Sequence, residues 1–186
     1  MSFLYGEKMK NVMIGAEKAV EVRVEHTIYT LIFNGYTMFA LQEEFGANFI
    51  PTMKKYSKDE LERVCRAASI MAQHGELARR RIGLDAQEIK EIKANDIAES
   101  SRDIVAVIQA VMRAFTVGFE REIKPEVEEV DLILMELKKD EKVKRAEYLR
   151  IGSVSGLSAD ETLSANVGMI YDLCEMYNQS HKQKEV

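Results

Sequence analysis

The longest apolar stretch of the chain limits its fold more than any other feature. It runs from Ile104 to Phe119, is 16 residues long, and contains Gln109 and Arg113. Because a membrane-spanning helix needs about 20 predominantly apolar residues, this stretch is too short and too polar to cross a bilayer. The stretch instead predicts a buried central helix of a soluble protein, and we expect no membrane among the partners.

The composition narrows the class of protein further. Hydrophobic residues make up 46% and charged residues 31% of the 186, with only 2 Pro and 10 Gly, which excludes collagen-like and disordered classes. The formal net charge of −5 argues against a nucleic-acid coat. Because the chain has only 2 Cys and no secretory signal, a reducing cytoplasmic location is expected.

A short alternating segment near the N-terminus predicts a β-hairpin. Val20, Val22 and Val24 alternate with charged residues, and a β-branched run over 27–33 follows them. Alternation and β-branched enrichment are typical of strands, so two short strands turning near Glu25 and His26 are expected. Since an isolated hairpin is only marginally stable in water, it should lie against helices.

Capping signals and apolar periodicity predict helices in the remainder of the chain. Helix-start signals are followed by periodic apolar residues, and glycine or proline lies near several of the expected ends. The first expected helix is 35–45, after Asn34. A strongly amphipathic helix should run from the capping box at Ser57 to near Arg81, and a short helix opened by Asp85 and Glu88 should cover 85–92. The apolar helix should run from Asn95 or Asp96 to Phe119, and two more should follow residue 142, the first opened by Ser158 and Glu161 and the last starting near Val167.

These elements predict a mainly α fold, a helical bundle with a short N-terminal β-hairpin and a small C-terminal helical unit. Between Glu120 and Glu147, 17 of 28 residues are charged, a density typical of a solvated connector. The predicted organisation is therefore an N-terminal arm (1–16), a hairpin plus helical core domain (17–122), a charged connector (123–141) and a small helical C-terminal unit (142–186).

The sequence offers no pattern typical of an active site. Neither G-x-x-x-x-G-K-[ST] nor G-x-G-x-x-G occurs, and the three histidines lack the spacing of metal ligands. Cys65 and Cys174 both fall on apolar stripes, where buried, unreactive thiols are common. We therefore predict no catalytic residue, no cofactor and no metal, and favour a non-enzymatic binding protein.

Two groups of residues are candidates for contacting a partner. Arg79, Arg80 and Arg81 are a candidate anion contact, since three guanidiniums can grip phosphates or an acidic partner. The alternative, which we favour, is that cations at a helix C-terminus stabilise the helix dipole. Residues off the apolar stripes are candidate contacts for a protein partner: Phe3, Leu4, Met53 and Tyr56.

The order of these motifs resembles a known family. Residues 24–33 (VEHTIYTLIF) lead into 38–46 (MFALQEEFG), and near the C-terminus 156–161 (GLSADE) are followed by 168–173 (GMIYDL). In the order of these motifs the chain resembles tail assembly chaperones of long-tailed bacteriophages. Residues of about 20–120 resemble the core unit of these chaperones, and residues 142–180 resemble the C-terminal extension that some of them carry.

The resemblance implies a function without catalysis. Such proteins bind the long helical tape measure protein and keep it soluble until the tail tube encloses it, and the extension recruits tail tube subunits. The protein would act in the host cytoplasm and be absent from the mature virion. Because proteins that coat a repetitive partner often form rings or helical arrays, we also expect a homo-oligomer.

Two other functions stay open at this point. A small helical nucleic-acid-associated protein, such as a phage regulator or a defence-complex subunit, is the alternative suggested by Arg79–Arg81 with Lys90 and Lys93 nearby. An enzyme with a site assembled from dispersed residues is the least favoured function, because nothing in the sequence selects a reaction.

Overall fold

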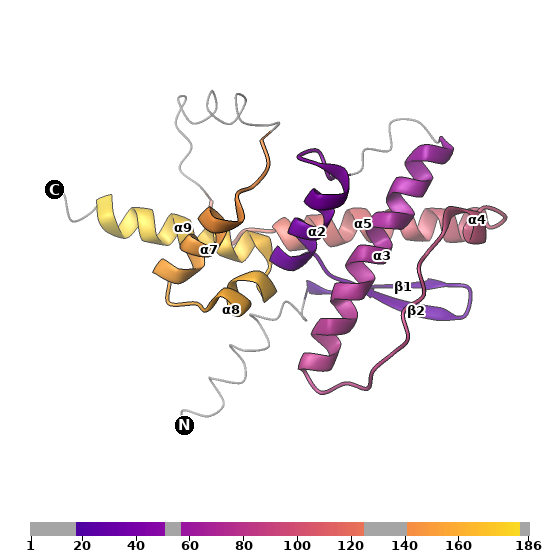
Figure 1. The fold of residues 1–186 in the computed structure, drawn as a ribbon, viewed down its shortest axis with the longest axis horizontal. Helices are drawn as coiled ribbons and strands as arrows, with labels where there is room; N and C mark the ends of the chain where they lie inside the picture. Colours follow the sequence, from indigo (N-terminus) through magenta and orange to yellow (C-terminus); the bar gives the residue numbers. More distant parts are fainter. Residues whose placement is uncertain (1–17, 51–56, 125–140, 183–186) are drawn as a thin grey trace.

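The alternating valines form the hairpin that their pattern predicts. A computed structural model describes residues 18–50, 57–124 and 141–182, and within these ranges it contains one two-stranded sheet and seven helices (Figure 1). The prediction of a mainly α fold with a short hairpin is confirmed. The elements are β1 (Val20–Val24), β2 (Thr27–Leu31), α2 (Gly35–Phe45), α3 (Lys58–Arg81), α4 (Ala94–Ile97), α5 (Ser101–Phe119), α7 (Arg145–Val154), α8 (Ala159–Ser164) and α9 (Val167–Lys182).

The hairpin has one buried face and one exposed face. The strands pair antiparallel from Val20 with Leu31 to Val24 with Thr27, and Glu25 takes a positive φ of 52° in the turn. The three valines of β1 are buried, whereas the charged residues between them are exposed. The period of two in the sequence thus places the apolar side chains against the helices, as expected for a half-buried strand.

Two long helices cover the hairpin, and glycines permit their close approach. α3 lies along β2, where a Cβ on Gly75 would be 1.8 Å from the carbonyl oxygen of Thr30. The N–H of Ile32, just after β2, donates to the carbonyl of Met71 in α3 at 3.5 Å. α5 lies along β1. The helix α3 therefore shields part of a strand that would otherwise be an open sheet edge.

The apolar helix α5 is buried on one face only. Val107, Val111 and Phe115 lie in the core, whereas Val105 and Met112 are 48% and 41% exposed. The expected buried central helix thus contributes one face to the core and exposes part of the other. Among the described residues the hairpin, α3, α4 and α9 pack against α5, and the sequence pattern alone does not reveal which neighbours a helix has.

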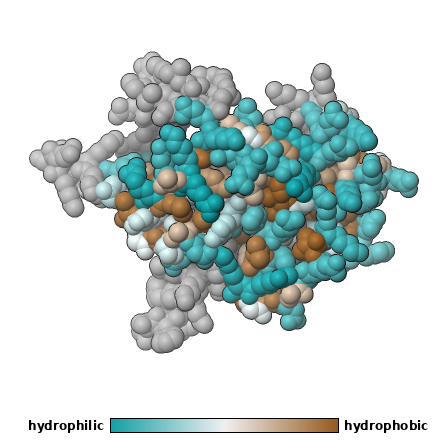
Figure 2. All heavy atoms as spheres, viewed as in Figure 1, coloured by the Kyte–Doolittle hydropathy of each residue, from teal (hydrophilic) through white to brown (hydrophobic). Residues whose placement is uncertain are grey.

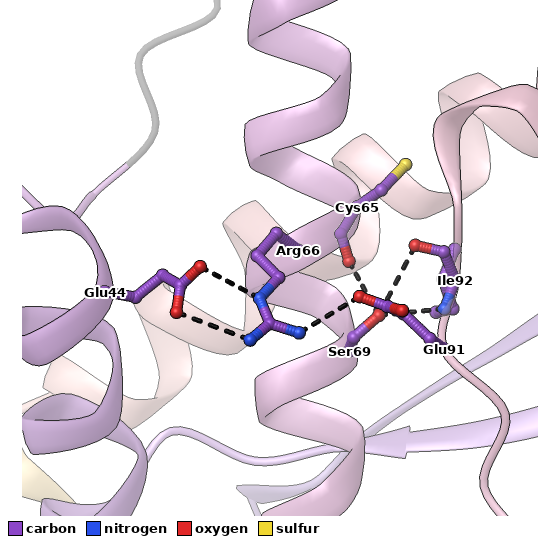
Figure 3. Close-up of polar contacts among 6 residues, drawn as sticks. All are labelled: Glu44, Cys65, Arg66, Ser69, Glu91 and Ile92. Carbon is purple, nitrogen blue, oxygen red and sulfur yellow. Dashed lines mark hydrogen bonds and ion pairs between the residues drawn. The ribbon is translucent and has the colours of Figure 1, made fainter.

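The predicted helix over 85–92 is absent, and this prediction was wrong. The segment that follows Gly83 is irregular, because side chains of α3 take up its backbone N–H groups. Glu76 accepts from the N–H of Gln87 at 2.7 Å. The Ser69 hydroxyl accepts from the N–H of Ile92 at 2.8 Å (Figure 3). In a helix over 85–92 the N–H of Ile92 would instead donate to the carbonyl four residues earlier, so its bond to Ser69 favours an extended path.

The start of the apolar helix also differs from the prediction. A continuous helix from Asn95 or Asp96 was expected, but the structure divides it into α4 and α5. Ser100 caps α5, because its hydroxyl accepts from the N–H of Asp103 at 3.2 Å. A serine in this position starts a new helix instead of continuing the previous one.

The C-terminal helices pack against the core domain. α7, α8 and α9 gather at one end of the molecule, beside α2 and the C-terminal end of α5 (Figure 1). Tyr148 of α7 is buried edge-on against Phe39 of α2, with ring centroids 5.5 Å apart. Asn34 and Asn166 form an isolated backbone bridge. One hydrophobic core thus includes residues of both regions.

Helix ends in the C-terminal region follow their sequence signals. Ser158 and Glu161 make the complete reciprocal capping box at the start of α8. The final helix begins at Val167, as predicted. Within the described ranges, no helix combines the length and the apolar character needed to cross a membrane.

Candidate functional site

The candidate partner contacts proposed from the sequence cannot be placed. Phe3, Leu4, Met53 and Tyr56 all lie outside the described residues, as do the arm 1–16 and most of the predicted connector. These assignments stay predictions. The site must therefore be built from what the described helices and the hairpin bring together.

The arginine triplet at the end of α3 is divided between two acidic partners. The Nε of Arg80 lies 2.9 Å from Glu76 Oε1, and the Nε of Arg79 lies 3.6 Å from the other oxygen of the same carboxylate. The guanidinium of Arg81 lies 2.8 Å from Asp160 of α8. Each arginine thus has an internal carboxylate nearby. That the triplet contacts an external anion stays a prediction.

Glu76 is the buried centre of this charge cluster. Its side chain is only 5% exposed, and burial by itself would raise the pKa of the carboxyl. The hydrogen bond from the Gln87 N–H and the charges of Arg80 and Arg79 outweigh burial, so the pKa lies below its usual value. Glu76 is therefore ionised near neutral pH, which suits a structural anchor for the segment after α3.

Arg81 joins the end of α3 to the C-terminal region. Its guanidinium also contacts the hydroxyl of Ser164 and lies over the ring of Tyr36, 5.6 Å from the centroid. The Tyr36 hydroxyl donates to Asp160 at 2.7 Å. The nearby His74 stacks on Tyr36, and burial together with the charge of Arg81 lowers its pKa. This cluster binds three elements to one another.

A second polar cluster fastens the irregular segment to α3 and α2. The guanidinium of Arg66 bridges Glu44 of α2 and Glu91, at 3.0 Å from each carboxylate (Figure 3). Cys65 precedes Arg66 in α3, and its thiol points away from these ion pairs (Figure 3). Burial, followed by the charges of Asp96 and Glu62, raises the pKa of this thiol to about 11. A thiol with so high a pKa is a poor nucleophile at neutral pH.

A hollow with room for a ligand lies between the hairpin and the C-terminal end of α3. It has a volume of about 530 Å³, within the range typical of ligand-binding sites. Thr30 and Ile32 of the hairpin side, Ala78 and Ile82 at the end of α3, and Leu84 beyond it line the hollow. We call this hollow the hairpin groove.

Charged groups from three elements face the hairpin groove. Arg79 of α3 and Arg113 of α5 lie in its lining, together with Glu21 of β1. Among the residues that the structure describes, neither arginine donates a hydrogen bond, and the Nε of Arg79 is buried without an acceptor. Ile82 and Leu84 at the rim are 39% and 49% exposed. The groove therefore combines apolar walls with guanidinium groups that retain free donors.

Sequence reasoning missed this groove for a specific reason. Arg113 was interpreted as a polar residue inside an apolar helix, and the end of the preceding amphipathic helix was considered only for its arginines. A charged residue inside an otherwise apolar run was the available signal. Only the packing of α3, α5 and the hairpin brings these side chains to one hollow.

Other apolar side chains reach the surface in separate patches. Figure 2 shows hydrophobic areas on the face that carries α3, divided by hydrophilic side chains. Exposed apolar residues include Leu77 on α3 and Met176 on α9. In the described ranges, no group of three or more His, Cys, Asp or Glu side chains could hold a metal ion. Unlike these separate patches, the hairpin groove combines exposed apolar side chains with a hollow.

Comparison of the chain with protein-family models, with curated proteins and with solved structures gave no match.

Proposed function

We propose that this protein is a phage or prophage tail assembly chaperone that binds a tape measure protein and keeps it soluble without catalysis. The proposal takes its partner from the resemblance of residues 24–33 and 38–46 to that family. In the host cytoplasm, the C-terminal helices would recruit tail tube subunits, and the chaperone would leave before the virion is complete.

The observation that supports it best is the hairpin groove. Ile82 and Leu84 expose much of their apolar surface at the rim and lead to the buried Ile32 and Ala78 inside. Exposed aliphatic side chains beside a concave apolar wall are typical of surfaces that bind another protein chain. An apolar partner would cover these side chains and would itself be protected from aggregation.

Many weak contacts suit such a chaperone better than one tight contact. A homo-oligomer that repeats the groove along a long partner would gain avidity, while each copy remained displaceable by the tail tube.

Co-expression with a tape measure protein tests the proposal. We expect the wild-type chain to raise the soluble fraction of that protein and to co-purify with it. Leu84→Asp should abolish both effects, because it places a charge at the rim of the groove. The matched control Met176→Asp changes an apolar side chain that is 54% exposed on α9 and should retain them. A partner that stays insoluble with wild type contradicts the function.

The alternative is a nucleic-acid-associated protein. This alternative function is supported by the guanidinium N–H groups of Arg79 and Arg113, which are also suited to binding phosphates. Gel mobility of DNA and RNA oligonucleotides at low and high salt separates it from the chaperone, since phosphate binding weakens steeply as salt is added.

A further inference from the structure

The hairpin groove carries a specific chemical preference that the proposed function does not contain. Its apolar walls are interrupted by two guanidiniums, from Arg79 on α3 and Arg113 on α5. We propose that the groove binds a peptide segment of the partner in which an acidic side chain lies among aliphatic ones. The identity of the partner rests on the proposed function; the preference for this chemistry does not.

The positions of the two arginines define where the acidic side chain would lie. Arg79 reaches the groove from the helix that forms one wall, and its side chain is only 20% exposed. Its Nε lies 3.6 Å from Glu76 without a hydrogen bond, and no hydrogen bond from its terminal nitrogens to a described residue is recorded. Arg113 comes from a different helix and is exposed. A carboxylate bound at either guanidinium would accept charge-assisted hydrogen bonds, which are stronger than bonds between neutral groups.

The apolar walls of the groove indicate which side chains should flank the acidic residue of the bound peptide. Ile82 and Leu84 form an exposed aliphatic rim, and Ile32 with Ala78 forms the apolar floor. Aliphatic side chains on either side of the acidic one would bury against these surfaces, and each buried apolar group contributes to affinity. A small inorganic anion would leave these walls uncovered, so it fits the groove less well than a peptide does.

Charge also favours a peptide over a nucleic acid. Glu21 of β1 lies in the same lining, and the chain as a whole has a formal charge of −5. A row of phosphates would meet Glu21, whereas a single carboxylate can lie beside the two arginines and leave Glu21 facing solvent. The observations thus favour one negative charge in an aliphatic setting.

Binding of synthetic peptides to the full-length protein tests the inference. The probes are three short fluorescein-labelled peptides of Leu, Ala and Gln that differ only in a central Glu, Gln or Lys, and the measurement is fluorescence anisotropy. We expect the Glu peptide to bind about fivefold more tightly than the Gln peptide, because it makes charge-assisted hydrogen bonds. The Lys peptide should bind most weakly, because like charges repel.

A charge reversal in the groove sharpens the test. With Arg113→Glu, which changes an exposed side chain, the order of the Glu and Lys peptides should reverse. The matched control is Arg102→Glu, an exposed arginine of the same helix that is not part of the groove lining, and it should keep the wild-type order. Leu84→Ser should weaken all three peptides equally, because it removes aliphatic surface and leaves the charges intact.

Several results would overturn the inference. These are equal affinity of the three peptides, no binding of any of them, an equal effect of Arg102→Glu and Arg113→Glu, or displacement of the Glu peptide by a DNA or RNA oligonucleotide at moderate salt. The protein could bind the peptides in the expected charge order and yet leave tape measure proteins insoluble. That result would support the proposed peptide preference of the groove and contradict the chaperone function. The two failures are therefore distinguishable.

Discussion

The side-chain amide of Gln42 is paired in both directions with the backbone of Val143. Its NH₂ group donates to the carbonyl at 2.9 Å, and its oxygen accepts from the N–H at 2.7 Å, across 101 positions of sequence. Gln42 belongs to α2 and is 7% exposed, while Val143 lies just before α7. One side chain of the core domain thus fixes the start of the C-terminal helices.

Removal of this amide should loosen the C-terminal region. In Gln42→Ala the backbone groups of Val143 lose both partners, so we expect a loss of about 2 kcal/mol in the free energy of unfolding. Urea denaturation measures the loss, and hydrogen exchange at the Val143 amide should become faster. Gln109→Ala on the exposed side of α5 is the control and should change neither. Unchanged exchange at Val143 would contradict the expected role of Gln42.

Tyr148→Phe should stabilise the protein or leave its stability unchanged. The Tyr148 side chain is 1% exposed, and its hydroxyl has no hydrogen-bond partner among the described residues. A buried unpaired hydroxyl costs about 1 kcal/mol or more, so its removal should raise the melting temperature. The burial of Tyr148 also raises the pKa of its phenol far above the usual value.

The matched change Tyr36→Phe removes a hydroxyl that donates to Asp160 at 2.7 Å. It should lower the melting temperature or leave it unchanged, since that bond is exposed. A clear loss of stability in Tyr148→Phe would show that the buried hydroxyl contributes a favourable interaction and would contradict the prediction.

Gly75→Ala should separate α3 from the hairpin. A Cβ at this position would lie 1.8 Å from the backbone oxygen of Thr30, so one element must move. Alanine favours a helix by about 1 kcal/mol over glycine, yet overpacking of this kind costs about 1–3 kcal/mol, and we expect a net loss. Thermal unfolding followed by circular dichroism measures it. Gln73→Ala, on an exposed position of the same helix, should have little effect, and a stabilised Gly75→Ala would contradict the close contact.

The pKa of Glu76 makes a pH-dependent contribution to stability. Because hydrogen bonding and two arginines lower this pKa in the folded state, the carboxylate stabilises the fold at pH values above its unfolded pKa of about 4.3. The contribution is lost as pH falls through the lower folded pKa. Glu76→Gln should therefore destabilise the protein at pH 7 and flatten the fall of stability below about pH 4.3.

Denaturant titrations of wild type and Glu76→Gln over a range of pH test this dependence. Glu99→Gln changes an exposed carboxylate for which the structure records no ion pair with a described residue, and it serves as the control. Parallel stability curves for wild type and Glu76→Gln at all pH values would contradict the assignment.

Several elements could be predicted because their signals are local. The valines of β1 alternate every second residue, Asn34 caps α2, and Ser158 with Glu161 caps α8, as their spacing indicated. Each signal acts within a few residues of chain, so neighbouring elements do not change its meaning.

The failed predictions depend on contacts between distant residues. Asp85 and Glu88 carry a local helix signal, but the N–H of Ile92 donates to Ser69 of α3 and not to a carbonyl of its own segment. Here a hydrogen bond from another element replaces the one that the local pattern would form. The exposed outer face of α5 likewise depends on which elements pack against it.

The sequence by itself determined the class of fold, the hairpin and most helix starts, because hydrophobic period and capping act over short distances along the chain. Tertiary structure alone decided how the C-terminal helices dock on the core, and it alone made the hairpin groove. Arg79 and Arg113 come from different helices, and only the close packing of α3 on β2 and of α5 on β1 places their side chains in one hollow. Binding chemistry of this kind depends on proximity in space, which a linear pattern does not contain.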